Sequence, residues 1–391
     1  MFAKRTAGAI VIWPAGTNPL VSAGLRSACR TFIGPDTHGP PTGCSHLTSA
    51  DHPDRAPVPD SSSAPPTELR SRSASVGTLA VRRERSVWFD RGMSAHPSRT
   101  INLLSVVIPT FNAVDLIGEQ LTALDAQKYD GAFEVIVSDN GSTDGLRSYI
   151  ESHPLGEALR LRWVDSSSVR GVSHARNVGV EHAAGEFVAF CDADDRVHPE
   201  WLQHMATAAQ TADVVGGGLE TASINTPLVN SWREFVPSET PHTYGSFLPY
   251  AFGANFGAWK TQYQSIGGCD ESMTAAGDDI DFCWRAQMAG MTFAHEPKAV
   301  VAYRLRSEIA SAWKQMRMYG SASAMLHKKY KGHGFKKPSG RALLTEIAGL
   351  TLLNPALPQS VTKMPRGKWV THAGFFAGKV QGSIRERTLF I

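Results

Sequence analysis

Three carboxylates stand within four residues in the segment Asp192-Ala193-Asp194-Asp195. Carboxylates packed this closely repel one another unless a cation or another positive group lies among them. Mg²⁺ and Mn²⁺ suit such a group, because these ions bind one or two carboxylates together with diphosphate oxygens, whose charge they neutralise. The segment therefore favours a divalent-metal site. The alternative is an acid-rich turn that caps a helix near Pro199, since short acidic matches are common.

Two other uses of an acid-rich loop fit this sequence poorly. A calcium-binding EF-hand loop needs Gly at its sixth position and Glu at its twelfth, where this chain, counted from Asp192, has Val197 and Gln203. An aspartyl-phosphate loop of the haloacid dehalogenase type resembles a strand followed by Asp-x-Asp-x and then Thr or Val. This chain has Arg196 at that last position.

A second group of acids, Asp278, Asp279 and Asp281, follows Gly277 at the start of a predicted helix that ends near Gly290. Acids at this place either favour the helix N-terminus alone or provide a general base. A substrate hydroxyl that attacks another group needs such a base, because a hydroxyl is a weak nucleophile until its proton is removed. We expect one of these acids to act as that base.

Apolar runs and turn residues predict alternating strands and helices from residue 103 onward. The predicted strands are residues 104–108, 133–137, 159–164 and 186–191. One amphipathic helix follows the first strand, with its apolar face formed by Leu116, Ile117, Leu121 and Leu124. Ser173 is expected to cap a second helix that runs through residue 184. This alternation predicts an α/β fold with a mainly parallel sheet and helices on both faces.

Polar residues follow three of the predicted strands. They are Thr110 and Asn112 after the first strand, Asp139 and Asn140 after the second, and the Asp192–Asp195 segment after the fourth. Ligands of such sheets bind beyond the carboxyl ends of the strands. We therefore expect these side chains to meet at one rim of the sheet.

From Leu104 to about Arg306 the chain resembles the family 2 glycosyltransferases. The segments that carry the resemblance are SVVIPTFN (105–112), FEVIVSDNGSTD (133–144), GVSHARNVGV (171–180), GEFVAFCDADD (185–195), IGGCDE (266–271) and GDDIDFCWR (277–285). The resemblance implies a GT-A fold, the Rossmann-like α/β fold of nucleotide-diphospho-sugar transferases, with a mainly parallel sheet flanked by helices. A helical C-terminal extension follows it.

The resemblance also implies roles for individual residues. Around the nucleoside and the donor it places Pro109, Thr110, Asn112, Asp139, Asn140 and Arg176. Asn140 stands where the family often has a second acid. Asp192 would approach the ribose or a metal-bound water, and Asp194 would bind Mg²⁺ or Mn²⁺ directly.

The implied reaction is a single displacement that inverts the anomeric carbon, with Asp279 as the catalytic base. Asp278, where Glu is usual, and Asn255, in an aromatic segment over residues 244–256, are assigned to the acceptor side. Core packing explains the aromatic segment equally well. The QxxRW signature of processive members is missing, and Ala302 stands where many relatives have His. We therefore expect one sugar to be transferred in each encounter.

The rest of the chain sets the domain boundaries. Residues 1–100 are rich in Pro, Ser, Gly, Thr and Arg and are predicted to be disordered, unless translation begins at Met93. Residues 101–306 form the predicted catalytic domain. Residues 307–391 form a basic, amphipathic, helical extension that either lies on an anionic membrane or packs on the catalytic domain. Five scattered cysteines indicate free thiols in a reducing compartment.

The sequence therefore predicts a cytoplasmic enzyme, either free or peripheral to the inner face of the membrane. It would move a sugar from a UDP- or dTDP-sugar to a carbohydrate or lipid-linked acceptor, in the synthesis of polysaccharide, glycolipid or cell-envelope glycan. A net charge of +3 gives no reason to expect a nucleic-acid partner. The alternatives are a non-catalytic sugar-nucleotide-binding or scaffold module of the same fold and, less favoured, a nucleotidyltransferase.

Overall fold

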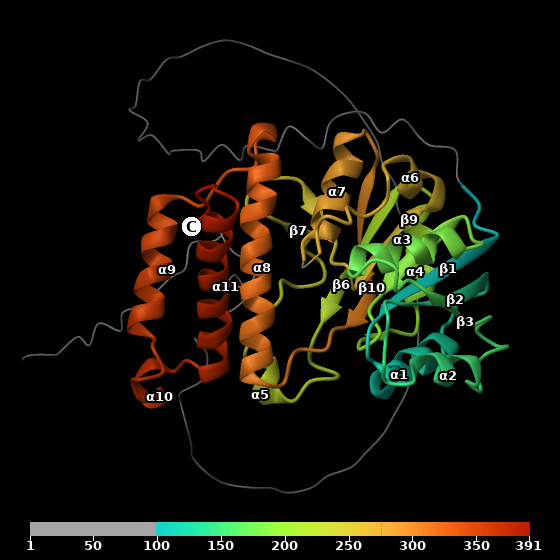
Figure 1. Cartoon of the computed structure of the whole chain (residues 1–391), viewed down its shortest axis with the longest axis horizontal. Helices are drawn as coiled ribbons and strands as arrows, with labels where there is room; N and C mark the ends of the chain where they lie inside the picture. Colours follow the sequence, from blue (N-terminus) through green and yellow to red (C-terminus); the bar gives the residue numbers. More distant parts are fainter. Residues whose placement is uncertain (1–98, 275) are drawn as a thin grey trace, which may run out of the picture. The chain divides into compact units, whose positions relative to one another are not determined.

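The computed structural model describes residues 99–274 and 276–391, and the strands within them form one large sheet and a small ribbon (Figure 1). The order in the large sheet is β3 (Arg162–Asp165), β2 (Ala132–Asp139), β1 (Leu103–Thr110), β4 (Phe187–Cys191), β9 (Asn255–Trp259), β6 (Val214–Glu220), β10 (Phe293–Ala302) and β5 (Arg196–Val197). The ribbon consists of β7 (His242–Thr243) and β8 (Pro249–Tyr250). β1 to β4 pair in parallel, and so do β6 and β10. The expected mainly parallel sheet is therefore confirmed, although β9 runs antiparallel between β4 and β6.

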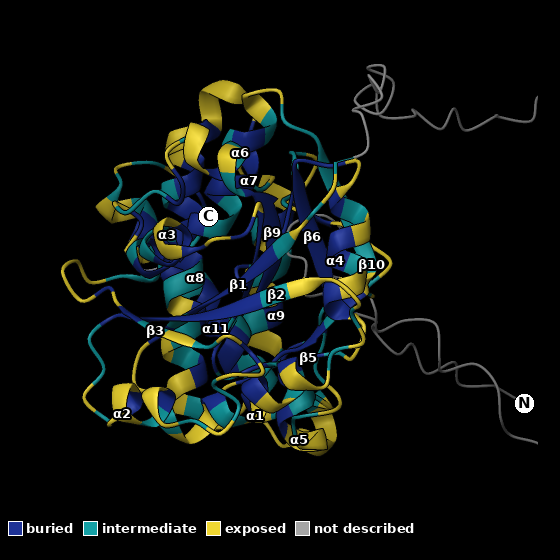
Figure 2. Cartoon of the chain, turned by 90° about the vertical axis from the view of Figure 1, so that its right-hand side faces the viewer, coloured by how far each residue is buried: buried dark blue, intermediate teal, exposed yellow. Residues whose placement is uncertain are grey.

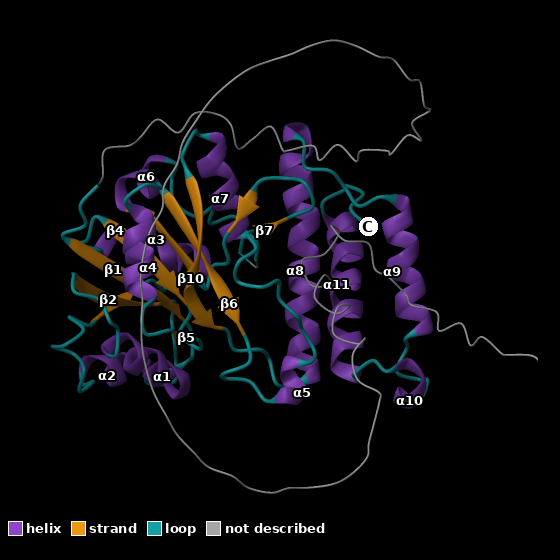
Figure 3. Ribbon diagram, turned by 180° about the vertical axis from the view of Figure 1, so that it is seen from behind, coloured by secondary structure: helices purple, strands orange, loops and turns teal. Residues whose placement is uncertain are grey.

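Helices cover both faces of the sheet, as expected (Figure 3). One face is packed by α1 (Val114–Asp125), α2 (Leu146–Glu151) and α4 (Trp201–Ala209), and the other by α3 (Val172–His182), α6 (Lys260–Ser265) and α7 (Asp278–Met288). Side chains alternate along β1 between the two faces of the sheet. Val106 and Ile108 belong to the apolar core on the face covered by α1, α2 and α4, and Val107 belongs to the core on the other face. Figure 2 shows β1, β6 and β9 buried over most of their length, which is why their sequences are nearly continuous apolar or glycine runs.

Three local expectations need correction. Leu116 is 36 % exposed, because the buried face of α1 is formed by Ile117, Gln120, Leu121 and Leu124. Ser173 does not cap its helix, since α3 already begins at Val172 and the Ser173 hydroxyl donates to the Met273 carbonyl at 3.3 Å. β3 begins only at Arg162, because residues 154–160 form turns in which the carbonyl of Leu159 accepts from the amide of Val135.

The C-terminal residues form a helical layer beside the sheet domain. It contains α8 (Ile309–Tyr330), a short 3-10 helix η1 (Lys331–His333), α9 (Gly340–Leu352), α10 (Gln359–Thr362) and α11 (Arg366–Arg385), and α5 (Pro227–Asn230) lies near one end of α8 (Figure 1). The backbones of α8 and α11 approach closely. At Gly378 there is no room for a side chain, since a Cβ atom there would collide with the carbonyl oxygen of Arg317. A Cβ atom at Gly320 would collide with the carbonyl oxygen of Phe375 in the same way.

Helix α8 packs on the sheet domain, which agrees with one of the two alternatives that its sequence left open. The Tyr330 hydroxyl donates to Asp281 at 2.6 Å, and the Tyr244 hydroxyl donates to Ser323 at the same distance. Lys329 pairs with both Asp270 and Asp281, at 2.8 and 2.6 Å. One basic residue of α8, Lys329, thus helps to hold the acidic helix α7 in place.

Among the described residues, none of the helices combines the length and the hydrophobicity that a bilayer crossing requires. Cys191, Cys269 and Cys283 are buried free thiols. The expectations for residues 1–98, which include Cys29, Cys44 and Met93, lie outside the described residues.

Candidate functional site

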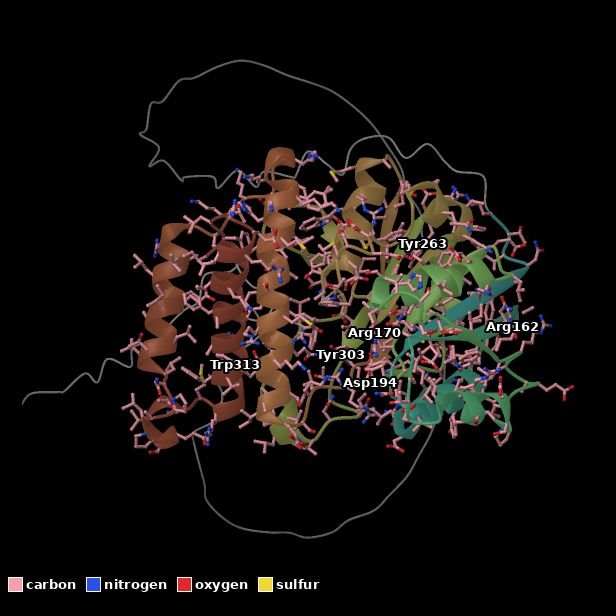
Figure 4. All side chains as sticks on the ribbon, in the orientation of Figure 1. Arg162, Arg170, Asp194, Tyr263, Tyr303 and Trp313 are labelled. Atoms are coloured by element: carbon pink, nitrogen blue, oxygen red, sulfur yellow. The ribbon has the colours of Figure 1, made fainter. Side chains whose placement is uncertain are left out.

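A cavity of about 360 Å³ lies between the rim of the sheet and α8. Its walls come from the loop after β4, the start of α7, the segment after β10 and one face of α8. Asp194 and Asp279 both line it, so the structure brings the two acidic groups to one cavity. In Figure 4, Asp194 and Tyr303 are labelled between the strands of the sheet and α8.

The acids after β4 form a compact oxygen-rich cluster. One carboxylate oxygen from each of Asp192, Asp194 and Asp195 lies within 4.8 Å of the others. Burial, and then the neighbouring charges of Asp192 and Asp194, raise the pKa of Asp195 well above its usual range. Asp195 accepts a 2.7 Å hydrogen bond from the Arg304 amide through Oδ1, whereas its buried Oδ2 has no partner in the described part of the chain. A hard divalent cation fits this donor set.

Arg306 is the side chain that offsets the charge of Asp194 in this structure. Its Nη1 donates to Asp194 Oδ2 at 2.8 Å. Burial disfavours the charge of Arg306, but the carboxylate of Asp194 raises its pKa above the ordinary value. A guanidinium therefore already occupies a position where positive charge is favourable.

Arg176 connects the two acidic groups. Its guanidinium is 4 % exposed, donates to Asp278 Oδ2 at 2.5 Å and lies 3.6 Å from Asp192 Oδ1. Burial opposes its charge, yet the carboxylates of Asp278 and Asp192 raise its pKa above the ordinary value. Gly253 makes room for it, since a Cβ atom at that position would collide with the guanidinium.

Asp279 is the acid of α7 that best suits a base. α7 begins after Gly277, whose φ of 88° is a left-handed conformation that glycine adopts easily, and this turn places Asp279 on the cavity wall. Its Oδ2 accepts from the Gly253 amide at 2.7 Å, and Oδ1 from the Ile280 amide at 2.8 Å. Burial, followed by the charge of Asp278, raises its pKa to about 6. Asp278 also lines the cavity, but Arg176 holds its carboxylate.

The residues assigned to the nucleoside gather where β1 and β2 end. Thr110 pairs with Asp139 across the sheet, and the carbonyl of Thr110 accepts from the amide of Asn140 at 2.8 Å. Asp139 accepts from the Ser142 amide and from the Trp163 indole, at 2.8 and 3.0 Å. These residues, together with Pro109 and Asn112, lie outside the described lining of the cavity, although Arg176 and Asp192 belong to that lining.

Asn140 has a structural task that an acid could not perform. Its Nδ2 donates to the carbonyls of Ser166 and Val169, at 2.5 and 2.8 Å, and its Oδ1 accepts from the Gly171 amide. A carboxylate has no N–H to offer those two carbonyls. The departure from the usual acid is therefore explained by the loop over residues 166–171, which Asn140 fastens to the rim.

The acceptor-side prediction for Asn255 does not fit the structure. The residue lies in β9 with no exposed surface. Its Nδ2 donates to the carbonyls of Gly218 and Ala299, at 2.7 and 2.8 Å, while its Oδ1 accepts from the Trp201 indole at 2.8 Å. Asn255 therefore satisfies buried polar groups inside the sheet and is not available to a substrate.

Sequence reasoning missed a second group of cavity residues. They come from the loop before β7, from the segment after β10 and from α8, and include Arg233, His242, Tyr303, Gln315 and Tyr319. None of these residues belongs to a recognisable sequence motif. The only hint of a site in the sequence was the aromatic content of the region.

Comparison with known families identifies the sheet domain. The family model described as glycosyl transferase family 2 matches residues 105–273. The mannosyltransferase PcManGT of Pyrobaculum calidifontis, solved in complex with GDP-Man and Mn²⁺, has a similar structure with a TM-score of 0.50 and 21 % sequence identity, over 75 % of this chain and 91 % of that one. This likeness shows the fold, which is the GT-A fold.

Curated relatives include three glycosyltransferases from distant organisms. The pre-mycofactocin glycosyltransferase of Mycobacterium tuberculosis is 27 % identical over 235 residues, which are 57 % of this chain and 47 % of that protein. The glycosyltransferase AglE of Haloferax volcanii is 34 % identical over 125 residues, 31 % of this chain and 40 % of that protein. The validoxylamine A glucosyltransferase of Streptomyces hygroscopicus is 29 % identical over 246 residues, 54 % of this chain and 58 % of that protein. The chain thus spans about half the length of these relatives.

The position of Arg176 predicts a large loss of stability when its charge is removed. Arg176→Met should lower the free energy of unfolding by about 3–5 kcal/mol, because the buried carboxylate of Asp278 and the partly exposed one of Asp192 lose their shared cation. Urea denaturation in metal-free buffer measures this loss. Lys128→Met, which removes an exposed pair with Glu200, is the control and should change stability by no more than about 0.5 kcal/mol.

A double variant separates charge from packing. Adding Asp278→Asn to Arg176→Met should recover part of the loss, because the unpaired carboxylate is then neutral. Strictly additive losses in the two single variants and the double variant would contradict the proposed coupling.

Proposed function

Since the model of glycosyl transferase family 2 matches residues 105–273, we propose that this chain is an inverting glycosyltransferase that moves one sugar from a nucleotide-diphosphate donor to an acceptor hydroxyl. One observation carries the proposal. An oxygen-rich acidic cluster and a partly buried carboxylate at a helix start, from segments distant in the chain, line the same cavity. Metal-assisted departure of a diphosphate and removal of a proton from the acceptor need these two groups together.

The cluster of Asp192, Asp194 and Asp195 would hold Mg²⁺ or Mn²⁺. Support comes from the spacing of its oxygens, from the unpartnered Oδ2 of Asp195 within the described chain, and from the Mn²⁺ that accompanies GDP-Man in the similar mannosyltransferase. When bound, the ion neutralises charge on the leaving diphosphate. Arg306, which pairs with Asp194 in this structure, would be available to an anionic oxygen of the donor if Asp194 held the ion instead.

Asp279 would accept the proton of the acceptor hydroxyl. The Gly253 amide fixes the direction of its carboxylate, and Arg176 binds the neighbouring Asp278, so that repulsion from Asp278 is reduced. The deprotonated oxygen attacks the anomeric carbon from the side opposite the diphosphate, and the sugar is inverted in one step. A general base typically contributes 10²–10⁴-fold to such a rate.

A non-catalytic module of the same fold is the alternative. Asn140 and Ala302 were the sequence features that favoured it, and both have packing explanations. Asn140 fastens a loop, and Ala302 is a fully buried residue of β10 paired with Glu220 and Arg196. A module that only binds its ligand has no need of a partly buried base on the cavity wall, and this favours the enzyme.

Replacing Asp279 and replacing Asp194 should each abolish transfer, but for different reasons. UDP-, dTDP- and GDP-sugars are tested with Mn²⁺ and a panel of acceptor sugars, and release of nucleoside diphosphate is measured. Asp279→Asn should lower the rate at least about 100-fold while calorimetry still detects donor binding. Asp194→Ala should remove the stimulation by Mn²⁺.

The exposed Asp115→Asn on α1 is the control and should leave transfer unchanged. Wild-type turnover in Asp279→Asn would defeat the role of Asp279 as the base. Donor binding without any nucleoside diphosphate release in the wild type would favour the non-catalytic module.

The pH dependence of transfer should follow the Asp279 carboxyl. Its pKa is raised to about 6, and only the deprotonated form accepts a proton, so the rate should rise between pH 5 and 7 and then level off. The measurement uses saturating donor and Mn²⁺, with donor affinity determined at each pH as the control. A rate that is constant or falls over this range would exclude Asp279 as the titrating base.

The outer face of the C-terminal layer has the chemistry of a membrane-binding surface. Exposed apolar side chains recur along α9 and α10, and we call them the α9 face: Leu344, Ile347, Leu352, Leu357 and Val361. Leu344 and Val361 are each 70 % exposed. Figures 1 and 3 show α9 and α10 on the side of α11 away from the sheet.

Charge indicates what this face binds. Exposed basic residues lie close to it in the sequence, namely Lys336, Lys337, Arg341, Lys363 and Arg366. The only acid between residues 336 and 369, Glu346, is paired with Lys379. A second copy of this face would bring like charges together, whereas anionic lipid attracts each basic residue by about 1 kcal/mol. We propose that the α9 face lies on an anionic membrane and brings the cavity near a lipid-linked acceptor.

Vesicle sedimentation tests the α9 face. The protein should bind vesicles that contain phosphatidylglycerol more strongly than pure phosphatidylcholine vesicles, and salt should weaken the binding. Leu344→Glu with Val361→Glu should reduce binding about tenfold or more. Leu228→Glu, at a 65 % exposed site on α5, is the matched control. Equal binding of the double variant and the control would exclude the α9 face.

A further inference from the structure

Within the part of the chain that the structure describes, Arg233 is a buried cation without an acidic partner. Its side chain is 9 % exposed, and its Nε and Nη1 atoms are buried with no hydrogen-bond partner within residues 99–274 and 276–391. The neighbouring acid, Glu234, is taken by Lys368 at 2.7 Å. A buried charge in this condition is strongly unfavourable unless something compensates it.

The other buried cations of the described chain are compensated. Arg176 is paired with Asp278, and Lys379, which is 3 % exposed, is paired with Glu346. Arg233 has only aromatic rings: its Cζ lies 4.4 Å from the ring centroid of Phe235, 5.3 Å from that of Tyr319 and 5.7 Å from that of Tyr303. Such rings recover part of the cost and hold the guanidinium in one orientation. They do not supply a negative charge.

Arg233 lines the same cavity as Asp194 and Asp279. His242 lines this part of the cavity too, and neither of its ring nitrogens has a partner in the described residues. Burial, followed by the charges of His295 and Arg233, lowers the pKa of His242 to about 3, so the ring is neutral and offers one donor and one acceptor. Six aromatic side chains also line the cavity, namely Phe235, Tyr244, Tyr250, Phe252, Tyr303 and Tyr319.

We propose that Arg233 binds an anionic group of a substrate, a phosphate or a carboxylate, within this aromatic part of the cavity. The ligand supplies the missing counter-charge, the neutral imidazole of His242 hydrogen-bonds to a hydroxyl beside it, and the rings pack on its apolar faces. The identity of the substrate rests on the proposed function, whereas binding of the anion does not. Its two sources are the diphosphate of the donor and an anionic group on the acceptor.

Thermal unfolding with inorganic phosphate tests the site without any need for transfer. At a phosphate concentration about 100 times its Kd, the unfolding temperature of the wild type should rise by roughly 5 °C above that in sodium chloride of equal ionic strength. Arg233→Met should abolish this rise, and its ligand-free unfolding temperature should equal or exceed that of the wild type, because an uncompensated charge has been removed. Arg317→Met, at an exposed arginine of α8, is the matched control and should respond as the wild type does.

A second arm identifies the source of the anion. The titration is repeated with saturating Mn²⁺ and UDP, and again with GDP in place of UDP. A phosphate response that persists assigns Arg233 to the acceptor, and one that disappears assigns it to the donor diphosphate.

The proposal is overturned if the wild type shows no phosphate response or if Arg233→Met responds as strongly as the wild type. Should Arg233→Met fail to fold, Arg233→Lys keeps the charge but loses the planar fork, and phosphate should bind it several-fold more weakly. Unchanged affinity in Arg233→Lys would also overturn the proposal. A normal phosphate response in a protein without transfer activity would defeat only the proposed function.

Discussion

The arrangement of the site depends on one buried cation between two carboxylates. Arg176 comes from α3, Asp192 from the loop after β4 and Asp278 from the first turn of α7. Each carboxylate would repel the other if the guanidinium were absent. Because Arg176 pairs with both, the start of α7 is drawn to the rim of the sheet, and Asp279 reaches the cavity that Asp194 also lines. The shared guanidinium thus offsets the repulsion between the acids and keeps two functional groups at a fixed distance.

Much of the fold and of the acidic site could be predicted because the signals are local. Buried parallel strands such as β1 are continuous apolar runs, and the acids stand directly after strand or helix boundaries. Asn255 could not be placed in this way, because its role depends on β9 lying antiparallel between β4 and β6, with partners from three other segments. Arg233 was missed for a related reason. A charged residue is normally exposed, and only tertiary packing reveals that no acid accompanies it.

Helix α8 joins the sheet domain to the other C-terminal helices. One side of it meets α11 at positions where only glycine fits, and another side supplies Met316, Tyr319 and Ser323 to the cavity wall. Its hydrogen bonds and ion pairs to α7 and to the segment before β8 secure this wall without a covalent link. A shift of α8 would therefore change the shape of the cavity while leaving the acids at the rim in place.

The division of the cavity walls has an evolutionary consequence. Asp192 and Asp194 belong to the segment 105–273 that the family model matches, whereas α8 lies entirely after it. Drift or recombination in the C-terminal segment can therefore remodel one wall of the cavity while the acids at the rim of the sheet are retained. Close homologues that differ mainly after residue 306 would therefore differ first in the substrate that they modify and only later in the chemistry of the reaction.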